Sequence, residues 1–68
     1  MDNVLVPPRQ ITGDYLAIAR RLRGVSQGDL ARRLGMRQSD LSELERGRRE
    51  IPGSFEDRFW RALAEDRP

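Results

Sequence analysis

The sequence predicts an all-α domain built from about four short helices. Three observations support this fold class: apolar residues recur at steps of three and four, a Ser or Thr precedes most of these segments, and glycine follows several of them. With 68 residues, the chain forms one domain at most. It has no cysteine, so its stability must come from packed helices rather than from disulfides or thiolate-bound metals.

Residues 1–11 are expected to form an N-terminal arm ahead of a helical domain at residues 12–65. The short β-prone run Val4-Leu5-Val6 is followed by Pro7 and Pro8, which do not fit inside a helix. No basic region precedes a long apolar stretch, so no signal peptide is expected. Because no apolar run approaches the ~20 residues of a spanning helix, we expect a cytoplasmic protein without a membrane partner.

The first helix is predicted to run from Thr12, which would cap it, to about Arg23, with Gly24 ending it. The spacing of its apolar residues predicts which side faces the core. That side comprises Tyr15, Leu16, Ala19 and Leu22.

Ser26 is expected to cap a second helix, with Asp29 acting as the partner in a short-armed capping box. Leu30, Ala31 and Leu34 would share its buried side.

Gly35 would end the second helix in the left-handed conformation. A third helix is predicted over about residues 38–46, with Leu41 and Leu44 directed inward and Gly47 closing it.

A fourth helix is predicted after the loop at residues 48–53. Ser54 would cap it, again with an acidic residue three positions later, and the helix would end near Glu65. Its wide apolar side comprises Phe55, Phe59, Trp60 and Leu63.

The spacing of the second and third helices predicts a helix-turn-helix motif. In this motif two helices cross sharply through a turn of three or four residues, often with glycine. Ala31 supplies the small residue that the crossing requires, Gly35 makes the turn, and Met36 fills the corner. Leu41 and Leu44 would then hold the second helix of the motif against the first.

Residues 26–47, SQGDLARRLGMRQSDLSELERG, resemble the Cro/cI family of helix-turn-helix domains, also called XRE-like. The matching positions include the small, turn and apolar residues together. They are Ser26, Gln27, Leu30, Ala31, Leu34, Gly35, Ser39, Leu41, Ser42, Leu44, Glu45 and Gly47, and Leu16, Ala19 and Arg20 fit the first helix. The resemblance covers about residues 12–63 and implies a lambda-repressor-like bundle.

Two departures from the family pattern affect what the resemblance implies. Arg37 stands where the family usually has a Ser or Thr cap for the third helix. Only Asp66-Arg67-Pro68 follow the fourth helix, where the family often has a fifth helix that makes the dimer contact. We therefore expect dimerisation through the N-terminal arm or through the fourth helix.

The resemblance implies a transcriptional regulator that binds double-stranded DNA. We expect a phage or bacterial repressor that acts at the nucleoid and binds a palindromic operator as a homodimer, with the third helix in the major groove. The residues expected to read bases are Arg37, Gln38, Ser39, Ser42 and Glu43. Those expected to contact the DNA backbone are Ser26, Gln27, Arg46, Arg48 and Arg49. A structural role is expected for Arg20, Ala31, Gly35, Leu41, Leu44 and Glu45, with Arg20 and Glu45 forming an ion pair.

The type and clustering of the basic residues support DNA binding more than the net charge does. All thirteen basic residues are arginine, as in proteins of GC-rich genomes, and the formal net charge is only +2. Local arginine clusters should therefore matter more than bulk attraction, and arginine suits bidentate recognition of phosphate and guanine. The clusters lie at residues 20–23, 32–33 and 46–49.

An enzyme is not expected, because the chain has no histidine, cysteine or lysine and no glycine-rich phosphate loop. For the same reason we expect no cofactor and no metal. The alternative is an antitoxin-like or other protein-binding helix-turn-helix module, in which exposed Phe55, Phe59 and Trp60 would contact a partner protein. A purely structural or dimerisation domain is a further alternative, against which the basic residues around the motif argue.

Overall fold

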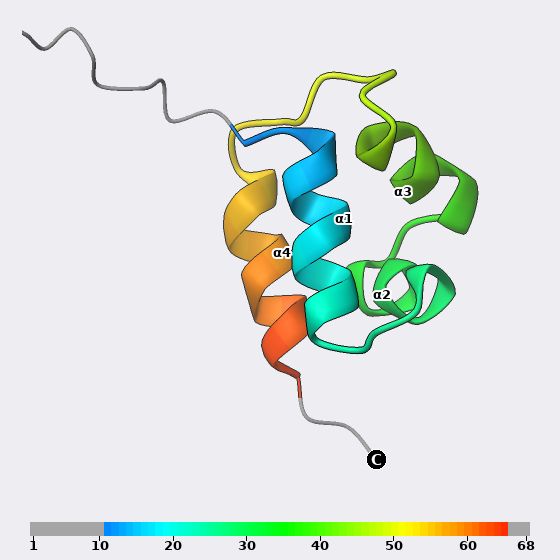
Figure 1. The fold of residues 1–68 in the computed structure, drawn as a ribbon, viewed down its shortest axis with the longest axis vertical. Helices are drawn as coiled ribbons and strands as arrows, with labels where there is room; N and C mark the ends of the chain where they lie inside the picture. Colours follow the sequence, from blue (N-terminus) through cyan, green and yellow to red (C-terminus); the bar gives the residue numbers. More distant parts are fainter. Residues whose placement is uncertain (1–10, 66–68) are drawn as a thin grey trace, which may run out of the picture.

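The computed structural model describes residues 11–65, so most of the predicted arm, including Val4-Leu5-Val6, and the tail 66–68 lie outside the described residues. Between residues 11 and 65 the chain forms four helices and no strand, which confirms the predicted fold class. They are α1 (Gly13–Leu22), α2 (Gln27–Leu34), α3 (Gln38–Glu45) and α4 (Phe55–Ala64) (Figure 1). None of these helices has the length and apolar character needed to cross a membrane.

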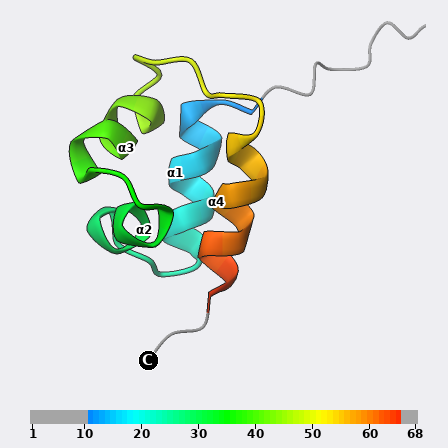
Figure 2. The ribbon, with the colours of Figure 1, turned by 180° about the vertical axis from the view of Figure 1, so that it is seen from behind.

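The helices are arranged as two pairs. α1 and α4 lie side by side and run in the same direction, as both views show (Figures 1 and 2). The second pair, α2 and α3, packs against the first: α3 contacts α1, and α2 contacts both α3 and α4. α3 therefore lies away from α4, with one side against the domain and the other facing outward.

The core lies where the four helices meet. Each helix contributes one fully buried large side chain: Leu16, Leu30, Leu41 and Phe59. Full burial of one such side chain stabilises the folded state by about 1.5–3 kcal/mol. Because a chain of this length buries a modest share of its surface, each of these residues carries a large part of the total stability.

Side chains and a glycine define three of the predicted helix ends. Thr12 Oγ1 accepts a hydrogen bond from the backbone N–H of Tyr15 at 3.1 Å, and Ser26 Oγ accepts one from Asp29 at 3.0 Å. Gly35 ends α2 with φ 71° and ψ 32°, a left-handed conformation that only glycine adopts without a steric cost. These local signals were correctly predicted.

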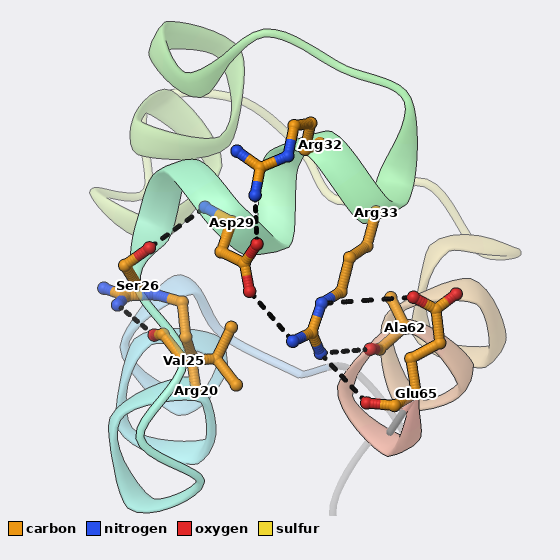
Figure 3. Close-up of polar contacts among 8 residues, drawn as sticks. All are labelled: Arg20, Val25, Ser26, Asp29, Arg32, Arg33, Ala62 and Glu65. Atoms are coloured by element: carbon orange, nitrogen blue, oxygen red, sulfur yellow. Dashed lines mark hydrogen bonds and ion pairs between the residues drawn. The ribbon is translucent and has the colours of Figure 1, made fainter. Parts of the chain in front are cut away.

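One predicted cap is wrong, and one predicted capping box is incomplete. Ser54 has helical dihedral angles and makes no capping hydrogen bond; the carbonyl of Pro52 accepts the N–H of Phe55 at 3.0 Å instead. At α2 the capping box is incomplete, because the Asp29 carboxylate pairs with Arg32 and Arg33 (Figure 3). Aspartate is one methylene shorter than the glutamate that usually reaches back to the N-cap N–H.

The predicted apolar side of α1 is also partly wrong. Leu16 is buried, but Tyr15 and Leu22 are 42% and 81% exposed. The buried side includes Ala17 and the charged Arg20 instead. α1 packs on α3 through Gly13 and the ion pair of Arg20 with Glu45, and apolar periodicity does not report such a contact.

Phe55 and Phe59, which the alternative of a protein-binding module requires to be exposed, are core residues. They are 3% and 0% exposed, because α4 closes the core. Trp60 is partly buried: its ring makes T-shaped contacts with the rings of Phe59 and Tyr15, and its indole N–H donates to Glu56 at 3.3 Å. The predicted partner surface is therefore not present as a set of exposed aromatic residues.

Two arginines link α2 to α4 by donating to carbonyl groups at the C-terminal end of the neighbouring helix. Arg33 Nη1 donates to the carbonyl of Ala62 at 2.9 Å (Figure 3), and Arg58 Nη2 donates to the carbonyl of Leu34 at 2.9 Å. The last carbonyls of a helix have no partner within the helix, and a cation there also complements the helix dipole. Arg33, with its further pair to Asp29, therefore belongs to the scaffold.

Gly13, the first residue of α1, lies directly against the end of α3. A Cβ atom at this position would lie 2.6 Å from the carbonyl oxygen of Glu45 and closer still to that of Leu44. Both are backbone atoms, which cannot move aside as a flexible side chain can. The contact between α1 and α3 therefore requires glycine here, a requirement that the sequence analysis missed.

Replacing Gly13 with alanine is expected to force α1 away from α3 and to lower the free energy of unfolding by about 1–3 kcal/mol, the usual cost of overpacking. Thermal unfolding followed by circular dichroism should show a midpoint lower by about 4–8 °C for each kcal/mol. Gly53→Ala is the matched control, because nothing lies within 4 Å of the added Cβ atom. A wild-type midpoint for Gly13→Ala would contradict the close approach.

Candidate nucleic-acid interface

The turn between α2 and α3 fixes how α3 is presented. The N–H of Met36 donates to the carbonyl of Ala31 at 2.9 Å, and Met36 packs against the core at the corner. Leu41 and Leu44 on the inward side of α3 are buried. The inner side of α3 is thus held by apolar packing, and its outer side is left to polar residues.

The five residues predicted to read bases lie together along the accessible side of α3 and the turn before it. Arg37, Gln38 and Ser39 are exposed, and Ser42 and Glu43 are half-buried. As expected from the missing Ser or Thr, Arg37 makes no side-chain cap for α3. Their proximity is a property of the fold, and their role in reading bases stays a prediction.

A continuous chain of hydrogen bonds leads from this surface into the core. Gln38 Nε2 donates to Gln27 Oε1 at 3.2 Å, and Gln27 Nε2 donates to Glu45 Oε1 at 2.9 Å. Arg20 then donates to both carboxylate oxygens of Glu45, at 2.8 and 3.0 Å. It also donates to the carbonyl of Val25 at 3.0 Å (Figure 3). The first residues of α2 and α3 are thereby tied to each other and to α1.

Arg20 and Glu45 form the ion pair that the family resemblance implied. Their side chains are only 9% and 5% exposed. Removing two charges from water is costly, and good geometry with further hydrogen bonds must offset that cost. Here the carboxylate accepts three hydrogen bonds and the guanidinium also reaches a backbone carbonyl. The pair therefore fixes the position of α3 relative to α1.

An open hollow lies between α1 and α3. Three arginines line it, Arg21 from α1 and Arg46 and Arg48 from the end of α3, together with Gln27 and Ser42. A concave surface lined by cations attracts a polyanion, although Asp14 and Glu45 also border it. The sequence-based prediction did not include Arg21 among the DNA contacts. Because adjacent residues of a helix point in different directions, an inward-facing Arg20 implies that Arg21 faces another side of α1.

Arg49, predicted to contact the DNA backbone, and Arg37, predicted to read a base, already have a partner within the domain. Arg49 Nη2 pairs with Asp40 at 3.2 Å, and Arg37 Nε lies 3.7 Å from the other oxygen of Asp40. Both arginines are largely exposed, and exposed pairs of this kind contribute little, so either can exchange Asp40 for another anion. The hydroxyl of Ser26 is used as the cap of α2.

Two helices that cross through a three-residue turn, with the second presenting a polar outer side, define the DNA-binding helix-turn-helix class. The family model described as a helix-turn-helix domain matches residues 12–67, and the chain belongs to this family. Domains of this class bind DNA and are typically not enzymes. The comparisons with curated proteins and with solved structures give no significant match.

Replacing Glu45 with glutamine is expected to lower the free energy of unfolding by about 3–5 kcal/mol, because it leaves the charge of Arg20 buried without its partner. Urea unfolding followed by circular dichroism would measure this loss. Glu43→Gln is the matched control, since Glu43 lies on the same helix but is half-buried on its outer side. Equal losses for the two variants would argue against a structural role for the ion pair.

Proposed function

We propose that this protein is a sequence-specific regulator of transcription that binds double-stranded DNA with α3 in the major groove. The observation that carries this proposal is the polar outer side of α3, held in one orientation by the hydrogen-bond chain through Gln27 and Glu45. The major groove admits an α-helix, and the first residues of a recognition helix reach the base edges.

Five residues are proposed to read the bases. Arginine can pair bidentately with guanine and glutamine with adenine, and glutamate can accept from the amino group of cytosine. Because Gln27 already holds the amide of Gln38, less side-chain freedom is lost when Gln38 meets a base. The proposed set is Arg37, Gln38, Ser39, Ser42 and Glu43.

The hollow between α1 and α3 is proposed to hold the phosphate backbone. Phosphate contacts position a protein on the duplex without specifying its sequence. The free N–H groups at the start of α2 favour an anion as well. The proposed set is Ser26, Gln27, Arg46, Arg48 and Arg49, to which the lining of the hollow adds Arg21.

We further propose that the protein is a repressor of the Cro/cI type. The resemblance of residues 26–47 supports this assignment, and such repressors bind two half-sites about one helical turn apart as a homodimer. It would act at the nucleoid of a bacterial cell on a palindromic operator. A protein-binding module is not proposed, because Phe55 and Phe59 lie in the core.

Selection from a library of random duplexes, with the full chain as bait, tests this function. We expect an enriched inverted repeat that binds at least about 10³-fold more tightly than random DNA at physiological salt. Bound duplexes without any shared sequence would contradict sequence-specific regulation.

Replacing Gln38 with alanine is expected to weaken binding to the selected site by about 1–3 kcal/mol and to relax the preference at one or two base pairs. Binding to random DNA should change little, because the backbone contacts remain. Fluorescence anisotropy with both duplexes measures the difference. An equal loss on both would show that Gln38 does not read a base.

Replacing Arg21 or Arg48 with glutamine is expected to flatten the plot of log K against log salt concentration by about 0.9 for each phosphate that the variant no longer neutralises. Arg61→Gln is the matched control, since Arg61 is exposed on α4 and does not line the hollow. Titrations at several salt concentrations provide the slopes. If the slopes for Arg21→Gln and Arg61→Gln agree, Arg21 does not bind a phosphate.

A further inference from the structure

Gly28, in the first turn of α2, has a backbone conformation that does not require glycine. The glycines with a positive φ among residues 11–65 are Gly24, Gly35 and Gly47, whereas Gly28 is part of the regular helix. Apart from proline, glycine is the least favourable residue in a helix. A residue that weakens its own helix without a conformational need points to a role outside that helix.

The space beside Gly28 is occupied by the side chain of Gln38, the first residue of α3. A Cβ atom at Gly28 would lie 3.2 Å from Oε1 of Gln38 and 3.7 Å from its Cδ. Apart from the glycine's own neighbours along α2, no other residue in the described part of the chain comes within 4 Å of this position. The shorter distance is tighter than an ordinary contact, so an added Cβ atom would displace the Gln38 amide.

The two ends of the Gln38 amide group are placed by adjacent residues of α2. Gln27 accepts a hydrogen bond from Nε2 at 3.2 Å, and Gly28 leaves room for Oε1. Glutamine pairs bidentately with adenine when the oxygen accepts from N6 and the nitrogen donates to N7. Nε2 has a second N–H for the base after it has bonded to Gln27, so the held amide can still make both bonds.

We infer that Gly28 determines which base the third helix prefers, through the orientation that it allows Gln38 to adopt. Gly28 is a positioning residue, and the base contact itself belongs to Gln38. The inference rests on the proposed function, in which Gln38 reads a base pair in the major groove. A side chain at position 28 would push Oε1 away from α2 and cover part of it, and a bidentate pair does not tolerate such a change in distance and angle.

Nuclear magnetic resonance of the free chain tests the orientation without DNA. We expect a nuclear Overhauser contact between the side-chain NH2 group of Gln38 and the side chain of Gln27, and its loss in Gly28→Val. Gly53→Ala is the control that keeps this contact, because its added Cβ atom meets nothing within 4 Å. A wild-type chain without the contact, or a Gly28→Val chain that retains it, would overturn the inference.

The thermal midpoint separates this role from a purely structural one. It should not fall in Gly28→Ala, because the displaced atoms belong to the end of a flexible, exposed side chain and alanine favours a helix more than glycine does. A lower midpoint in Gly28→Ala would show that glycine serves the packing of α2 and would overturn the inference.

Fluorescence anisotropy measures the base preference with the selected duplex, its variants at the base pair that Gln38→Ala affects, and random DNA. We expect Gly28→Ala to reduce the preference at this base pair by at least about threefold. Gly28→Val should reduce it as far as Gln38→Ala does, by about 5- to 150-fold. Affinity for random DNA should not change, because the backbone contacts remain, and Gly53→Ala should bind every duplex like the wild type.

The double variant Gly28→Ala/Gln38→Ala decides whether Gly28 acts through Gln38. Without the Gln38 amide the added Cβ atom meets no side chain, so the double variant should bind the selected duplex as Gln38→Ala alone does. A further loss would show that position 28 meets the DNA itself and would overturn the inference. A wild-type base preference in Gly28→Val would also overturn it and leave the proposed function standing, whereas a wild-type chain without any base preference would overturn the proposed function.

Discussion

The buried ion pair between Arg20 and Glu45 sets the geometry on which the outer surface depends. It joins α1 to the last residue of α3, and its carboxylate also holds Gln27 at the start of α2. Apolar packing alone is compatible with small shifts of one helix along another, whereas a bidentate pair defines both distance and orientation. The side of α3 that faces outward is therefore fixed by a contact in the interior.

Gly13 and the ion pair act at the same contact, about two helical turns apart along α1. The missing Cβ atom lets the start of α1 lie against the carbonyls of Leu44 and Glu45. This close approach brings Arg20 within hydrogen-bonding distance of the Glu45 carboxylate. In this small domain, the close approach at Gly13 and the Arg20–Glu45 ion pair together define the position of α3 relative to α1.

The arginines of this chain serve two different purposes. Arg33 and Arg58 donate to helix-end carbonyls within the domain, whereas Arg21 and Arg48 line the open hollow. Because the formal net charge is only +2, attraction to a polyanion depends on the position of the arginines that line the hollow rather than on the net charge. Residue type does not separate the two groups; packing around each guanidinium does.

The sequence by itself determined the four helices, the turn at Gly35 and the residues gathered on the outer side of α3, because spacing, caps and glycine turns act over a few residues. The family resemblance added the Arg20–Glu45 pair. Only the tertiary structure decided which apolar residues are covered: Tyr15 and Leu22 are exposed, and Phe59 lies at the centre of the core. Periodicity identifies an apolar face of a helix, but which neighbour covers that face depends on contacts between segments far apart in the chain.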